Sequence, residues 1–199
     1  IGAALSLIGL VAMAIQLALT PGQNPLNAVS CILFCLSLIA LYSASGIYHF
    51  SRAAANVLVV LRKLDHAMIY VLIAGTYTPL LLGLLPAPRA EVFTAVIWGV
   101  ALAGIVMKLC WINAPRWLGT TLYLLLGWAI AIDLPALAAL PVPAVALLAA
   151  GGLLYTVGGL IYMIKRPNLS GRFGFHEIFH LFVIAGSLCH YFLVLLYIA

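Results

Sequence analysis

The sequence predicts an all-α membrane protein, folded as a single domain of seven transmembrane helices. Its 199 residues are 66% hydrophobic and only 7% charged, whereas a soluble domain has a charged fraction of about a quarter. Apolar runs of about 20 residues, the length that crosses a hydrocarbon core, recur along the chain between short segments rich in proline and glycine. An ordinary soluble domain is therefore excluded.

Seven apolar runs are long enough to span a membrane. They cover residues 1–20, 27–50, 65–85, 91–111, 117–134, 142–164 and 176–198. Helix-breaking residues separate them, such as Pro21-Gly22 after the first run and Pro115 before the fifth. The intervening segment 51–64 is too short to span, and its composition predicts a short amphipathic helix on the cytoplasmic interface.

The third run contains a sequence that disturbs helices, Gly75-Thr76-Tyr77-Thr78-Pro79. Proline removes a backbone hydrogen bond, and threonine hydroxyls can satisfy the freed carbonyls. We expect a bend or a local unwinding here, which forms a cavity wall.

Basic residues orient the helices. Eight of the nine Lys and Arg residues fall at alternate connections: Arg52, Arg62 and Lys63, then Lys108 and Arg116, then Lys165, Arg166 and Arg172. Cytoplasmic loops accumulate Lys and Arg, so we predict a cytoplasmic N-terminus and an outside C-terminus in the cell inner (plasma) membrane. No Lys/Arg-rich block is present, so the basic excess indicates topology and no nucleic-acid partner.

The second run ends in a polar stripe. Ser45 and His49 are four residues apart and share a helix face. Lipid offers polar groups no partners, so this face is expected to lie against protein. Cys31, Cys35 and Ser37 are typical of a helix-packing seam, whereas a histidine at membrane depth favours a functional role.

The seventh run opens with His176-Glu177-Ile178-Phe179-His180. Histidines at i and i+4 are separated by about 6 Å along a helix, so two imidazoles can converge on one ion. The predicted topology brings His49 to the same membrane depth. These three histidines predict a metal site near the cytoplasmic face.

Three histidine ligands leave a fourth tetrahedral position for water, as in catalytic zinc sites. Asp65, at the same level, could act as general base or orient that water, and Ser45 could hold the water or a developing oxyanion. Two alternatives stay open: Asp65 could instead pair with Arg62-Lys63, and the metal could be structural, clamping the second and seventh helices.

Three other polar residues are weaker candidates. Glu177 completes the His-Glu-x-x-His string of soluble zinc peptidases, where the Glu is the general base, but it could equally pair with Arg172 or face water. His190 lies too far along its helix to share the ion, which favours a hydrogen-bonded interior role. His66 points about 100° away from its neighbour Asp65, which favours a supporting contact over ligation.

These motifs resemble the signature of bacterial hemolysin III proteins, which belong with the progestin and adiponectin receptors (PAQR) and more distantly with alkaline ceramidases. The resemblance rests on Ser45-x3-His49, on Asp65 to Pro79 and on Gly174 to His180, and it covers essentially the whole chain. It implies a zinc ion near the cytoplasmic face, with His49, His176 and His180 as ligands and with Ser45 and Asp65 near the zinc-bound water. Glu177 is not part of that shared set.

Two classes of function follow. The first is a zinc-dependent hydrolase of a lipid amide or ester, similar to a ceramidase, whose substrate is a membrane lipid in an intramembrane cavity. The second is a non-enzymatic membrane-homeostasis or lipid-sensing protein with a structural zinc. Transport is disfavoured, because the ionisable groups gather near one face rather than at the bilayer midplane.

Overall fold

The computed structural model describes residues 1–111, 113–132, 137–138, 140–170 and 173–199. Within these ranges the structure is helical and contains no strand, as predicted. Six of the described helices are long and apolar enough to cross a membrane. The chain divides into two compact units, Ile1–Asn113 with Val194–Ala199, and Ala114–Leu193.

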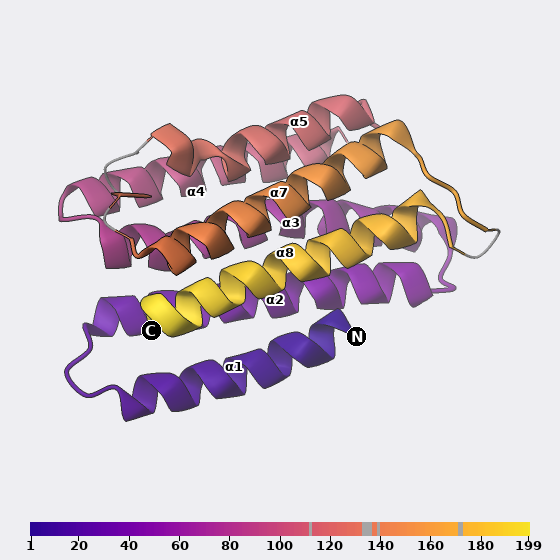
Figure 1. Cartoon of the computed structure of the whole chain (residues 1–199). Helices are drawn as coiled ribbons and strands as arrows, with labels where there is room; N and C mark the ends of the chain where they lie inside the picture. Colours follow the sequence, from indigo (N-terminus) through magenta and orange to yellow (C-terminus); the bar gives the residue numbers. More distant parts are fainter. Residues whose placement is uncertain (112, 133–136, 139, 171–172) are drawn as a thin grey trace. The chain divides into compact units, whose positions relative to one another are not determined.

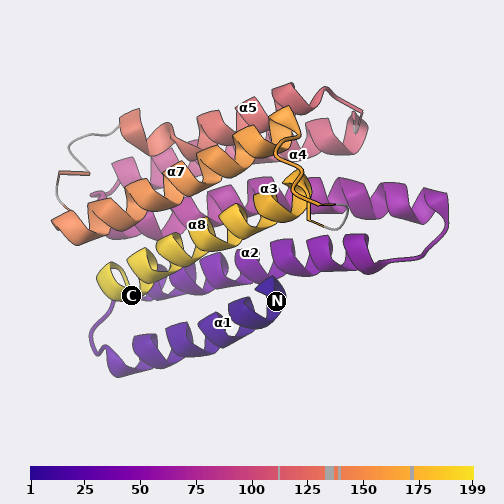
Figure 2. The ribbon, with the colours of Figure 1, turned by 45° about the vertical axis from the view of Figure 1, so that its right-hand side comes forward.

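The first unit is built from four long helices. They are α1 (Gly2–Leu19), α2 (Pro25–Phe50), α3 (Ala55–Leu84) and α4 (Arg89–Cys110). Each packs against the next in the sequence, and α1, α2 and α3 run in alternating directions (Figures 1 and 2). The C-terminal residues complete the unit, since Asn27 Nδ2 donates to the carbonyl of Ile198 at 2.7 Å.

The contact between α2 and α3 confirms the predicted packing seam. Cys31, Phe34 and Cys35 are fully buried. Ser37 packs where a Cβ on Gly75 would lie, and its hydroxyl donates to the carbonyl of Phe34 at 2.6 Å. Small side chains thus let these two helices approach closely.

The prediction of a separate interfacial helix within 51–64 is wrong. After an extended turn at Ser51, α3 begins at Ala55 and continues through the charged positions. Nothing from Ala55 onward breaks a helix before Pro79, and Arg62 and Lys63 find acceptors near the end of α4. Charged side chains that reach acceptors on a neighbouring helix therefore do not interrupt α3.

A bend or a local unwinding was predicted before Pro79, and the unwinding does not occur. The helix α3 stays continuous to Leu84, and every residue from 74 to 81 is buried. The hydroxyls of Thr76 and Thr78 each donate to the carbonyl four residues earlier, both at 2.8 Å. Tertiary packing holds the helix where the local sequence disfavours it.

The described part of the second unit contains two long helices, one shorter helix and one 3-10 turn. They are α5 (Arg116–Gly127), the 3-10 turn η1 (Ala129–Ile132), α7 (Val142–Ile164) and α8 (Phe175–Tyr197), of which the last four residues belong to the first unit. The single span predicted at 117–134 is divided after Gly127, and positions 133–134 lie outside the described residues. The count of seven spans therefore stays a prediction, as does the single domain.

Glycines on α7 allow its neighbours to pack closely. Gly151 and Gly158 face α8, whereas Gly159 faces Thr120 of α5. A Cβ on Gly151 would lie 2.6 Å from Nε2 of His190, so only glycine fits this contact. The helix α7 therefore supports α8, which carries the paired histidines.

Candidate metal centre

The start of α8 is held by one side chain of its own first turn and one from the connection before it. Oε2 of Glu177 accepts the backbone N–H of Gly174 at 2.8 Å, and Oδ1 of Asn168 accepts that of Phe175 at 3.1 Å. Nδ2 of Asn168 in turn donates to the carbonyl of Lys165 at 3.2 Å. The first N–H groups of a helix have no partner within the helix, so these bonds fix where α8 begins.

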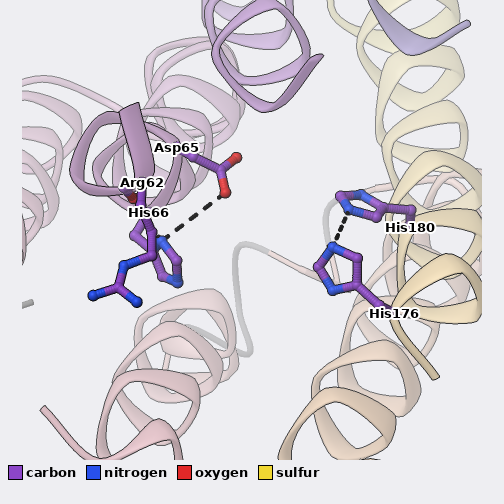
Figure 3. A network of polar contacts seen from close by, with 5 residues as sticks. All are labelled: Arg62, Asp65, His66, His176 and His180. Atoms are coloured by element: carbon purple, nitrogen blue, oxygen red, sulfur yellow. Dashed lines mark hydrogen bonds and ion pairs between the residues drawn. The ribbon is translucent and has the colours of Figure 1, made fainter. Parts of the chain in front are cut away.

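The histidine pair occupies the first two turns of this capped helix. The Nε2 atoms of His176 and His180 are 3.1 Å apart, and the ring planes are nearly perpendicular, at 89°. Figure 3 shows the two rings pointing toward one another from α8. Two nitrogens bound to one tetrahedral zinc ion lie about 3.3 Å apart, so the spacing of this pair already fits a shared metal.

The third predicted ligand is His49, one residue before the end of α2. One ligand atom each from His49, His176 and His180 can be chosen so that all lie within 4.8 Å of one another. The three residues that the sequence predicted as ligands could therefore hold a metal ion. Imidazole donors suit zinc and several other transition metals.

Ser45 and Asp65 occupy neighbouring helices of the first unit. Ser45 is buried on α2, one turn before His49. The side chain of Asp65 is 15% exposed, and its Oδ2 lies 3.9 Å from Nδ1 of His66 (Figure 3). Both predicted catalytic residues are therefore largely shielded from solvent.

The alternative that Asp65 pairs with the preceding bases finds no support. In the ranges that the structure describes, Asp65 makes no ion pair with Arg62 or Lys63. Nδ1 of His66 lies 2.7 Å from the carbonyl of Arg62 and must donate to it. The carboxylate of Asp65 is thus not neutralised by the two adjacent cations.

Glu177 has a structural role that the sequence reasoning missed. Its carboxylate reaches back to the N–H of Gly174, the acceptor geometry of a capping box. The usual signal was absent, because a glycine stands where Ser or Thr normally begins this motif. The proposed partner Arg172 lies outside the described residues.

His190 has the interior position predicted for it, buried against α7, but the hydrogen bond expected with that role is missing at Nδ1. Its ring stacks on Tyr155, with centroids 5.3 Å apart. Nδ1 has no hydrogen-bond partner among the described residues. The close approach of Gly151 makes His190 a packing residue of the α7–α8 contact.

Comparison with known proteins identifies the family. A family model described as Haemolysin-III related matches residues 1–191. The chain belongs to the haemolysin-III-related family. As a member of this family with six membrane-length apolar helices, it is a multi-pass membrane protein.

Two relatives support the same assignment. The haemolysin-III-related chain is 38% identical over 172 residues to a hemolysin-3 homolog of Bacillus subtilis, covering 86% of this chain and 78% of the relative. It is 34% identical over 199 residues to hemolysin-3 of Bacillus cereus, covering 100% of this chain and 87% of the relative. No solved structure matches the chain.

Proposed function

We propose that this protein is a zinc-dependent hydrolase of a lipid amide or ester. The observation that carries the proposal is the pair His176 and His180, whose Nε2 atoms lie 3.1 Å apart, within hydrogen-bond distance and close to the separation of two nitrogens on one tetrahedral ion. His49 contributes the third nitrogen of the group. Three protein ligands leave a fourth position open, which is the arrangement of catalytic zinc sites.

Asp65 and Ser45 supply the remaining groups. A bound zinc ion would supply Lewis-acid polarisation of the carbonyl and activation of water. Asp65 accepts the proton from the attacking water, a role that fits a shielded carboxylate without a Lys or Arg partner. The hydroxyl of Ser45 donates to the developing oxyanion. Glu177 is not the base, because its carboxylate caps α8.

The substrate is a membrane lipid, because the site residues lie at the ends of membrane-length helices. His49 is the penultimate residue of α2, and His176 is the second residue of α8. Following the basic-residue bias, this end of the helices is the cytoplasmic one. A lipid whose acyl chain lies between helices presents its amide or ester bond at this depth.

Turnover of defined lipids by the purified, zinc-loaded protein tests the proposal. We expect hydrolysis of ceramides or other acyl lipids, abolished in His180→Ala and in Asp65→Asn. The matched control is Glu177→Gln, which retains an acceptor for the helix cap and should keep most of the activity. Absence of turnover, or turnover unchanged in His180→Ala, would overturn the proposal.

A second candidate is a non-enzymatic homeostasis or lipid-sensing protein with a structural zinc. It is favoured by the origin of the ligands, which come from helices near opposite ends of the sequence. Under this alternative His180→Ala lowers thermal stability strongly, whereas Asp65→Ala leaves stability and cellular phenotype unchanged. An Asp65→Ala protein that binds zinc but has lost its function supports the hydrolase instead.

A further inference from the structure

A cluster of cationic side chains forms where the start of α3 meets the end of α4. The ring of Tyr70 packs where a Cβ on Gly104 would lie. Nζ of Lys63 donates to the carbonyl of Leu109 at 2.5 Å. From the first contact to the second, the residue number decreases on α3 and increases on α4, so the two helices are antiparallel.

This register places four basic residues together. One turn from Tyr70 is His66, and one turn from Gly104 is Lys108, so these two side chains face each other and interact electrostatically. One turn further, Nη2 of Arg62 donates to Oδ1 of Asn113 at 3.2 Å. Arg62, Lys63, His66 and Lys108 are called the basic cluster below.

Two members of the basic cluster have donors that no protein group of the described ranges satisfies. Lys108 is 4% exposed and makes no hydrogen bond or ion pair with any residue of the described ranges. Nε of Arg62 is buried and likewise without a hydrogen-bond partner in that part of the chain. Cationic donors that no protein group of the described ranges satisfies can bind an anion, because hydrogen bonds between ionised groups are strong.

Acidic side chains of the first unit do not supply that anion. Asp65 approaches the cluster only at His66, at 3.9 Å. Glu91, the other acid of this unit, lies in the first turn of α4, at the opposite end of the helix. The three Lys and Arg side chains of the cluster therefore make no ion pair with either acid of this unit.

The surroundings of the basic cluster are those of a membrane interface. Leu64, Leu109 and Trp111 beside it are exposed by 42%, 40% and 52%. Exposed tryptophan at the end of a spanning helix is typical of the headgroup level, and basic pockets between membrane helices suit lipid headgroups. We propose that the basic cluster binds the phosphate group of an anionic membrane lipid, with Lys108 and Arg62 as its main donors.

Lipid titration of the full-length protein in a neutral detergent tests this binding. Phosphatidylglycerol should bind and raise the thermal midpoint, whereas phosphatidylcholine with the same acyl chains should not. Lys108→Met should weaken phosphatidylglycerol binding at least about tenfold, because it removes a charge-assisted bond to phosphate. The same substitution should leave the midpoint without lipid unchanged or raise it, because methionine keeps the largely buried stem and removes one of several neighbouring positive charges.

Three controls make the result decisive. Arg52→Met removes an exposed cation of the preceding connection and should change the affinity less than about twofold. Arg62→Met provides a second variant with the same expected loss of binding, should Lys108→Met fail to fold. Zinc content should stay at the wild-type level in all three variants, which separates this site from the histidines.

Equal binding of the two lipids, or wild-type affinity in both Lys108→Met and Arg62→Met, would overturn the proposal. A titration with inorganic phosphate distinguishes a lipid headgroup from a free anion. We expect it to bind more weakly than phosphatidylglycerol, because it lacks the acyl chains that contact the exposed apolar residues. If it produces the full shift and lipid adds nothing, the ligand is a free anion and the assignment to a lipid is wrong.

Discussion

The first turn of α8 and the paired ends of α3 and α4 are both polar, but their polar groups are satisfied differently. At α8, Asn168 and Glu177 satisfy backbone N–H groups, so the helix start is fixed and the histidine pair is held in position. At the basic cluster, Nζ of Lys108 and Nε of Arg62 have no hydrogen-bond partner among the described residues. A completed polar network positions ligands in advance, whereas an incomplete one indicates that a ligand is missing.

Removing the histidine pair should have the largest effect and should separate the two regions. His176→Ala combined with His180→Ala is expected to lower bound zinc at least about tenfold, since each ligand contributes to one shared ion. Elemental analysis of the purified protein measures this loss. Lipid binding at the basic cluster should be unchanged, and a parallel loss of both would show that the regions are not independent.

Disturbing the register of α3 and α4 should have the next largest effect. Gly104→Ala forces a methyl group into the ring of Tyr70 and is expected to destabilise the protein by about 1–3 kcal/mol. Binding of phosphatidylglycerol should fall with it, because the facing cations shift apart. The matched control is Gly99→Ala on the same helix, where a Cβ meets nothing within 4 Å. Thermal unfolding in detergent should leave this control as stable as the wild type or more so.

Weakening the cap of α8 should have a smaller effect that sharpens the comparison. Asn168→Ala removes the acceptor for the N–H of Phe175, and the expected loss of stability is about 1 kcal/mol. Asn168→Asp keeps an acceptor and should retain most of that stability. Zinc affinity should follow the same order, and an affinity unchanged in Asn168→Ala would show that the cap does not position the histidines.

Much of the fold could be predicted from hydropathy and helix-breaking residues. The helix α7 occupies the predicted range 142–164, because Pro141 marks the start of its apolar run. The division after Gly127 was missed, because the sequence Ala-Ile-Ala-Ile of η1 is as apolar as a spanning helix. Hydropathy reports apolar length and carries no information on where the backbone leaves α-helical geometry.

The candidate site was predictable to the extent that helical spacing determines it. The i, i+4 spacing of His176 and His180 is sufficient to predict their convergence, which the structure confirms. Lys108 was interpreted only as a topology signal, because its burial depends on the packing of α4 against α3. Such pairing is a tertiary property, and no pattern within a single helix reports it.

Zinc X-ray absorption of the purified protein tests the central claim most directly. Three imidazole nitrogens and one further light atom, all at about 2.0–2.1 Å, are expected around each zinc ion. In His49→Ala the fit should lose one imidazole while the pair from α8 remains. Zinc bound by cysteine sulfur, or a wild-type spectrum retained in His49→Ala, would contradict the three-histidine site.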